Sequence, residues 1–190
     1  MKKKRSKNGS KENTHSYKSV VEEPEAVYLT AREAQLLRVV HGNAENSYIK
    51  RALHLMGLEK ISPFREVQNV SDFISCIREG VPKIAVDNLA SITGFNGAEM
   101  AGILRTSDRN LRRYQPKEKL NAEQSERIIE LAKLYSRGEE IFGSLDAFKE
   151  WMSSSVLALG NKKPKDFLDT SLGIEMLMDE LGRIEHGIFA

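Results

Sequence analysis

Residues 96–114 read NGAEMAGILRTSDRNLRRY, and this stretch decides how the fold is interpreted. Asn96 can cap a first short helix, and Ser107 can cap a second one after a tight turn. Ala101 is small enough to let the second helix pack across the first. Leu111, ten positions later, is a branched apolar residue that can anchor the second helix. The spacing therefore predicts a helix-turn-helix.

The second helix of this unit has a basic outer face. With Leu111 at the buried centre and a rotation of about 100° per residue, Arg109 and Arg113 point to the opposite side. Arginine can fork onto guanine edges or grip phosphates, and asparagine can pair with adenine. A phosphate can also meet the free N–H groups where the helix begins. The predicted DNA-binding residues are Ser107, Arg109, Asn110, Arg112 and Arg113. The alternative is an ordinary helical hairpin with a charged surface.

Two residues depart from the simplest form of the motif. The turn usually has glycine where this chain has Arg105. Asp108 repels phosphates unless it pairs with a neighbouring arginine. The structure must therefore provide a turn that accepts arginine and a partner for the aspartate.

The flanking sequence is also helical in pattern. Apolar residues recur at helical spacing in the segments 30–41, 47–56, 72–78, 84–92, 122–135, 145–152 and 174–184. Asn121, Ser144 and Thr170 are suitable caps for the last three helices. Gly138 and Gly143 punctuate the chain after the helix that Asn121 begins. The fold class expected is all-α.

Charge is segregated along the 190 residues, although the net charge is only +2. Residues 1–18 carry seven basic side chains and one acid, and residues 121–190 carry eight and thirteen. Residues 1–25 offer little to bury, so we expect a disordered basic tail. That tail is either a solvated solubilising segment or an arm that touches DNA. A basic middle and an acidic end suggest two surfaces for two partners.

Enzymatic chemistry has little support in the sequence. No metal spacing joins the four histidines, which are His15, His41, His54 and His186. Cys76 is the only cysteine and lies on an apolar helix face, as a buried structural thiol would. We expect no catalytic residue, no metal and no cofactor. No apolar run is long enough to span a bilayer, so a cytoplasmic protein without a membrane partner is expected.

Eight short segments carry a family resemblance, and they occur in a fixed order over residues 73–190. They are EGVPK (79–83), SDRNLRRY (107–114), LNAEQSER (120–127), IFG (141–143), AFKEW (147–151), LGNKKP (159–164), FLDT (167–170) and LGRIEHG (181–187). In this order the chain resembles antitoxins of the Xre/MbcA/ParS toxin-binding group, the partners of RES-domain toxins.

The resemblance implies both an architecture and a function. Members are helical homodimers that repress their own operon through the helix-turn-helix. Their C-terminal domain binds the toxin and blocks its active-site cleft. RES toxins resemble ADP-ribosyl transferases and consume NAD, so any NAD chemistry would belong to the partner. Together with the sequence pattern, the resemblance predicts three regions: the disordered basic tail (1–25), a helical region with the helix-turn-helix DNA-binding domain (26–118), and a small helical toxin-binding domain (119–190).

Two segments are the best candidates for toxin contact, a loop after residue 159 and the C-terminal end. The predicted toxin-binding residues are Gly160, Asn161, Lys162, Lys163, Arg183, Glu185, His186, Ile188 and Phe189. Many relatives have a second glycine where this chain has Asn161, which tolerates a left-handed backbone. Ile188 and Phe189 either fill a partner pocket or fold back onto their own core. Trp151 is expected to be core rather than interface.

Two other functions stay open at this stage. One is a stand-alone helix-turn-helix repressor whose C-terminal domain dimerises or senses a ligand. The other is a structural adaptor that does not bind DNA. Loss of operator binding on replacing Arg109 and Arg113 would separate the adaptor from the rest.

Overall fold

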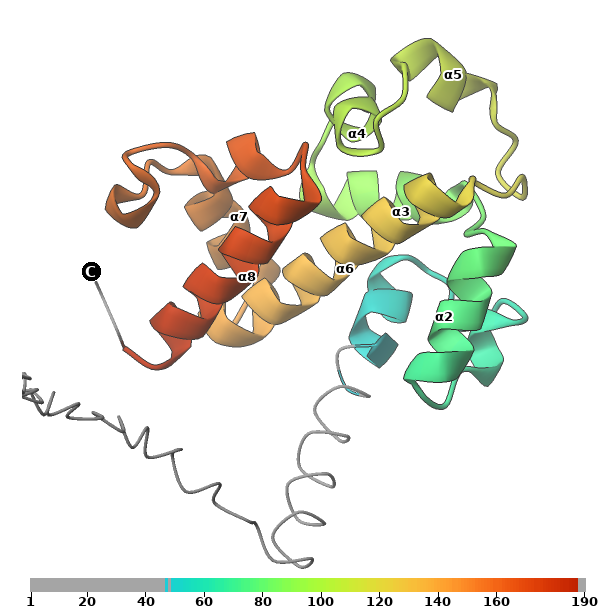
Figure 1. Ribbon diagram of the computed structural model, residues 1–190, viewed down its shortest axis with the longest axis horizontal. Helices are drawn as coiled ribbons and strands as arrows, with labels where there is room; N and C mark the ends of the chain where they lie inside the picture. Colours follow the sequence, from blue (N-terminus) through green and yellow to red (C-terminus); the bar gives the residue numbers. More distant parts are fainter. Residues whose placement is uncertain (1–46, 48, 188–190) are drawn as a thin grey trace, which may run out of the picture.

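The computed structural model describes residues 47 and 49–187, and all regular secondary structure there is helical (Figure 1). After a helical segment at 49–55 come η1 (Phe64–Glu66), α2 (Val70–Glu79), α3 (Ile84–Thr93), α4 (Gly97–Ile103), α5 (Asp108–Arg113), α6 (Ala122–Phe142), α7 (Leu145–Ser153), η2 (Leu157–Leu159), η3 (Pro164–Phe167) and α8 (Ser171–Glu185). The expected all-α class is confirmed. The predictions for the 1–25 tail, Ile188 and Phe189 lie outside the described residues.

The helix starts follow the capping residues closely. The Asn96 side chain accepts hydrogen bonds from the N–H groups of Ala98 and Glu99, and the Glu99 carboxylate accepts one from the N–H of Asn96. Asn121 and Gln124 form the same reciprocal capping box at the start of α6. Each box satisfies N–H groups that have no partner within the helix. These starts were predictable because a cap is a local interaction.

The expectation that Gly138 ends a helix is wrong, because this residue lies inside α6. A Cβ atom at this position would lie 2.4 Å from the Phe148 ring of α7. Glycine therefore lets α7 approach α6 closely. This gain in packing outweighs the low helix propensity of glycine, which costs about 1 kcal/mol relative to alanine.

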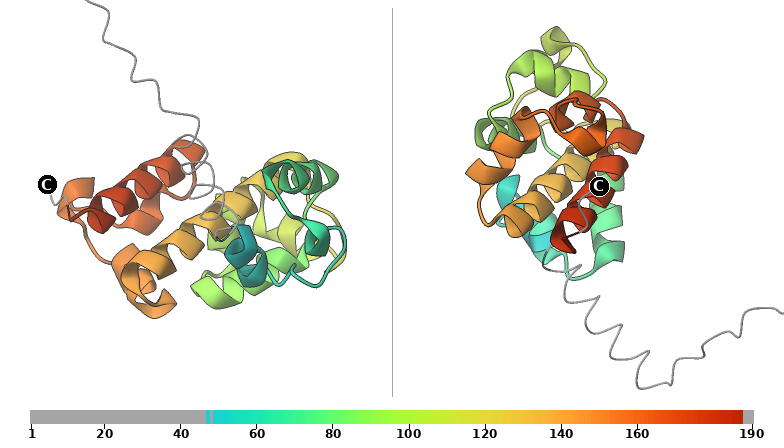
Figure 2. Two further views of the ribbon diagram at one scale, coloured as in Figure 1. Left: turned by 90° about the horizontal axis from the view of Figure 1, so that it is seen from below. Right: turned by 90° about the vertical axis from the view of Figure 1, so that its left-hand side faces the viewer.

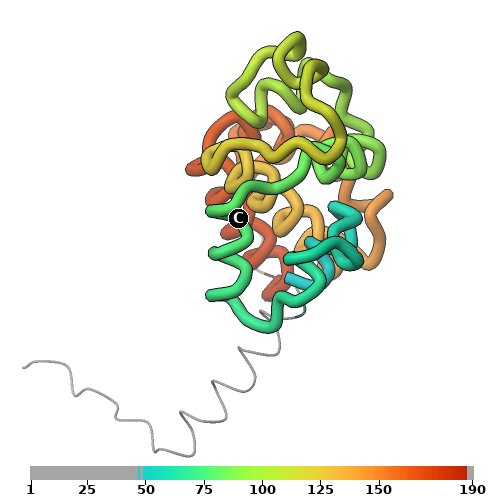
Figure 3. The backbone as a smooth tube through the Cα atoms, turned by 90° about the vertical axis from the view of Figure 1, so that its right-hand side faces the viewer, coloured from blue at the N-terminus to red at the C-terminus, as the bar shows by residue number. Residues whose placement is uncertain are grey.

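Helix α6 is the central element of the fold. It is about 31 Å long at 1.5 Å per residue. It contacts α2 and α3 and also α7 and α8, and α8 lies along it in Figures 1 and 2. Helices α4 and α5 project at one end of the molecule, well away from α2 (Figure 3). The helix-turn-helix and the C-terminal helices thus share one scaffold.

An aromatic cluster holds the C-terminal helices together. The rings of Tyr135 and Phe148 meet edge to face at 5.1 Å between centroids. Trp151 stacks on Phe148 at 5.7 Å and also meets Phe142 at 5.5 Å. Phe148 is completely buried, whereas Trp151 is half-buried. Trp151 therefore packs on the core, as expected, but keeps one side near the surface.

Candidate nucleic-acid interface and partner-binding surface

The turn between α4 and α5 accepts arginine at the usual glycine position. Arg105 has a φ of 50°, in the left-handed region. Its N–H donates to the Gly102 carbonyl at 3.1 Å, and the Thr106 N–H donates to the Ala101 carbonyl at 2.9 Å. These two bonds form the Schellman motif that ends many helices. The Arg105 side chain reaches Glu123 of α6 at 3.4 Å. The substitution therefore leaves the turn intact.

The face of α5 agrees with the helical spacing. Leu111 is 4% exposed and Ala101 is 3% exposed, so the two anchoring residues are both buried. Arg109 and Arg113 are exposed. Within the described part of the chain, neither guanidinium has a hydrogen bond or an ion pair. Two cations on one exposed face are therefore available to a polyanion.

The other three predicted DNA-binding residues have local partners. Ser107 Oγ accepts a hydrogen bond from the Asn110 N–H at 3.1 Å, and Asn110 Nδ2 donates to Thr106 Oγ1 at 2.9 Å. Arg112 contacts the Asp108 carboxylate through two nitrogens: Nε donates to Oδ1 at 3.0 Å, and Nη2 lies 2.7 Å from Oδ2. Asp108 thus has the arginine partner that its position requires. DNA contact by all five predicted residues stays a prediction.

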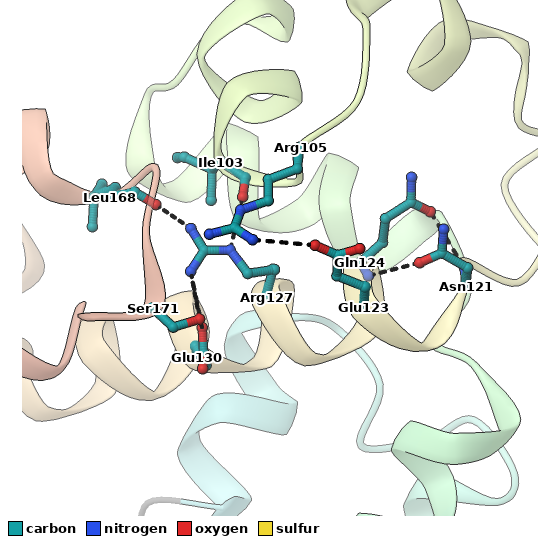
Figure 4. A network of polar contacts seen from close by, with 9 residues as sticks. All are labelled: Ile103, Arg105, Asn121, Glu123, Gln124, Arg127, Glu130, Leu168 and Ser171. Carbon is teal, nitrogen blue, oxygen red and sulfur yellow. Dashed lines mark hydrogen bonds and ion pairs between the residues drawn. The ribbon is translucent and has the colours of Figure 1, made fainter. Parts of the chain in front are cut away.

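A buried arginine joins the two halves of the structure (Figure 4). The Arg127 side chain is 3% exposed. It donates to the Ile103 carbonyl at the end of α4 at 3.0 Å and to the Leu168 carbonyl before α8. It also contacts Ser171 Oγ and the Glu130 carboxylate, each at 3.1 Å. One guanidinium therefore ties the first helix of the helix-turn-helix to the start of α8.

Arg127 was not among the predicted site residues, although its spacing along the chain contained a signal. Arg127 lies four residues before Leu131 and seven before Leu134, both fully buried. This spacing places it on the core stripe of α6. A charged side chain on such a stripe is rarely buried without partners.

The loop after α7 has a defined shape. Val156 and Lys162 pair in an isolated antiparallel bridge. At the tip, Gly160 and Asn161 have φ values of 66° and 60°. Asn161 thus adopts the left-handed conformation that asparagine tolerates, as expected from the sequence. Lys162 and Lys163 are exposed, and Lys162 Nζ lies 5.8 Å from the centre of the Phe167 ring.

The end of α8 presents the other predicted contact residues. Arg183, Glu185 and His186 are all exposed. Arg183 pairs with Glu180 at 2.7 Å, and Glu185 pairs with Arg137 of α6. The structure therefore places these residues on an accessible surface, and their contact with a toxin stays a prediction.

No helix within residues 49–187 combines the length and the apolar character needed to cross a bilayer.

Two family matches cover most of the described chain. Residues 72–133 match the antitoxin Xre-like helix-turn-helix domain. Residues 137–187 match the antitoxin Xre/MbcA/ParS C-terminal toxin-binding domain. The two matches meet inside α6, so no linker separates them.

Curated relatives point in the same direction. Antitoxin Xre of Photorhabdus laumondii is 32% identical over 114 residues, which are 59% of this chain and 77% of the relative. Antitoxin Xre of Yersinia enterocolitica is 32% identical over 112 residues, which are 56% of this chain and 75% of the relative. The Prs ADP-ribosylating antitoxin of a Sphingobium species is 39% identical over 80 residues, which are 37% of this chain and 50% of the relative.

Proposed function

Because the chain belongs to the Xre/MbcA/ParS family of antitoxins, we propose that it neutralises a RES-type, NAD-consuming toxin and represses its own operon. Neutralisation is by direct binding through the C-terminal domain in the cytoplasm. Repression is by a homodimer that binds operator DNA. The observation that carries the proposal is the uninterrupted helix α6, which packs against α2 and α3 of the helix-turn-helix region and against α7 and α8 of the segment that matches the toxin-binding domain. The first of these regions also contains the exposed basic face of α5.

The DNA-binding part of the proposal rests on α5. The exposed Arg109 and Arg113 match the positions that a recognition helix uses for base edges and phosphates. A homodimer would present two such helices to half-sites about 34 Å apart, one turn of B-DNA. Binding should weaken steeply with salt, since each phosphate contact releases counterions.

The toxin-binding part rests on the family match and on charge. Residues 121–190 carry eight basic and thirteen acidic side chains, which favours a partner with a basic face. The name of the Sphingobium relative links such an antitoxin to ADP-ribosylation, a reaction that takes ADP-ribose from NAD. This supports a RES-type toxin as the partner and is consistent with a chain that has no catalytic role of its own.

Co-expression with the RES-domain protein encoded beside this chain tests neutralisation. We expect a stable complex on size-exclusion chromatography, and cellular NAD should fall only when this chain is absent. If no complex forms and NAD does not change, a stand-alone helix-turn-helix repressor becomes the better account.

Binding to the upstream DNA, measured by fluorescence anisotropy at physiological salt, tests repression. Replacing both Arg109 and Arg113 with alanine should weaken binding by about thirtyfold or more, because each lost contact costs about 1–3 kcal/mol. The matched control replaces Arg65 and Arg78, two exposed arginines outside α4 and α5, and should bind within a few-fold of wild type. Equal affinity of the two double variants would refute α5 as the recognition helix.

A further inference from the structure

A groove of about 280 Å³ lies between α7, the 156–158 segment and the end of α8. Phe142 and Trp151 line it from the aromatic cluster, and Leu157 and Ile184 line it from the loop and from α8. We call this feature the α7–α8 groove. Most of its lining is apolar, so it suits an apolar side chain better than a small polar ligand.

Leu157 is the most unusual residue of this groove. It is 73% exposed, although it belongs to a short 3-10 helix that the Val156–Lys162 bridge holds in place. Its side chain thus contributes little to the packing of this chain. An exposed leucine beside an aromatic surface on a fixed backbone resembles the anchor regions of protein interfaces.

The groove also contains one carboxylate. Glu180 lines it and is 6% exposed, and its ion pair with Arg183 is at 2.7 Å. The surrounding residues 137–187 carry six basic and ten acidic side chains. This charge favours an apolar side chain that arrives on a basic surface.

The position of the groove identifies its occupant. All of its lining residues lie within 137–187, the segment that matches the toxin-binding domain. The loop 160–163 begins three residues after Leu157, and Arg183 and Glu185 flank Ile184 in the sequence. The two surfaces predicted to touch the toxin therefore border the same groove.

We propose that the α7–α8 groove receives an apolar side chain from the basic face of the toxin, with Leu157 and Trp151 as the principal contacts. This rests on the proposed toxin-binding function and specifies where its binding energy is concentrated. Loss of a central apolar anchor typically lowers affinity by tenfold or more.

The chain contains its own matched control. Leu172, in the first turn of α8, is 75% exposed, close to the value for Leu157, and does not line the groove. Leu157→Ser and Leu172→Ser should both leave folding unchanged, because neither side chain is buried. Affinity for the purified RES-domain toxin encoded by the adjacent gene is measured for full-length wild type and both variants by calorimetry.

We expect Leu157→Ser to bind the toxin at least tenfold more weakly, and Leu172→Ser to bind within about twofold of wild type. Equal affinities of the two variants would overturn the groove proposal and leave the toxin-binding function standing. Failure of wild type to bind would overturn the function itself. A change only in self-association would assign the groove to a second copy of this chain instead.

Trp151 supplies a direct readout, because it is the only tryptophan of the chain. Labelling this chain alone with 5-fluorotryptophan gives a single ¹⁹F resonance from the groove. Saturating toxin should shift that resonance, and operator DNA should not. An unchanged resonance in the toxin complex would contradict an occupied groove.

Discussion

Replacing Arg127 with methionine tests whether the buried guanidinium holds the two halves of the chain together. Methionine keeps a flexible stem of similar length but donates no hydrogen bond. The change leaves the carbonyls of Ile103 and Leu168 without their guanidinium donor. Each unsatisfied buried group costs about 1–3 kcal/mol.

The expected loss in the free energy of unfolding is about 3–4 kcal/mol. Most of it comes from the two carbonyls. The lost ion pair with Glu130 adds to this, because the Glu130 side chain is only 28% exposed and loses its partner. Relief of the buried charge of Arg127 offsets part of the loss. For a chain of this size the melting temperature should fall by about 6–16 °C.

Urea unfolding followed by circular dichroism measures this change, and the fluorescence of Trp151 gives a second probe. The matched control is Arg65→Met, which removes an exposed pair with Glu66 whose side chains are 63% and 58% exposed. The control should lose no more than about 0.5 kcal/mol. A loss below about 1 kcal/mol for the Arg127 variant, or one equal to the control, would refute the role assigned to this network.

Three further changes test individual contacts. In thermal unfolding, Arg105→Gly should stabilise the chain by about 0.5–1 kcal/mol, because glycine adopts the left-handed conformation without steric strain. Arg105→Val should destabilise the chain, and the opposite order of stabilities would contradict the turn geometry. Asp108→Asn removes a charge that repels phosphate and frees Arg112 from its ion pair, so the affinity for DNA should rise about threefold to tenfold. An unchanged affinity would mean that Arg112 does not reach the DNA. Burial, and then the charge of Glu99, raise the pKa of Tyr135, so its contribution to stability is constant below about pH 10 and is lost as the pH rises further. Between about pH 8 and pH 11, the urea midpoint should therefore fall less for Tyr135→Phe than for wild type. Equal falls would show that ionisation of the Tyr135 phenol does not cause the loss of stability.

Local interactions explain most of what the sequence predicted about the fold. The predicted caps each accept a backbone hydrogen bond at the start of their helices, and they are Asn96, Ser107, Asn121, Ser144 and Thr170. A cap depends on residues two or three positions away, so the sequence contains the whole interaction. The prediction for Gly138 was wrong, because glycine is needed there to make room for the ring of Phe148, which lies on another helix.

The candidate site divides in the same way. Helical rotation about Leu111 was enough to place Arg109 and Arg113 on the exposed face of α5. Arg127 was missed because its carbonyl partners lie 24 and 41 residues away. The α7–α8 groove was equally out of reach, because α6, α7, the 156–158 segment and α8 all contribute to it. Helical spacing gives the faces of single helices, and tertiary packing decides which faces meet.

We expect the continuity of α6 to make the two proposed binding surfaces parts of one cooperative unit. The helix buries Ile128 and Leu131 towards one end and Tyr135 towards the other, and it does not break where the two family matches meet. A cut near residue 134 would expose apolar surface on both fragments, so we do not expect either to fold alone. A ligand that binds only the folded chain at either end lowers the population of each opened form in which its own site is lost, and an opening of the whole of α6 is such a form. Toxin bound near α8 should therefore slow amide hydrogen exchange in the first turns of α6, beside the helix-turn-helix.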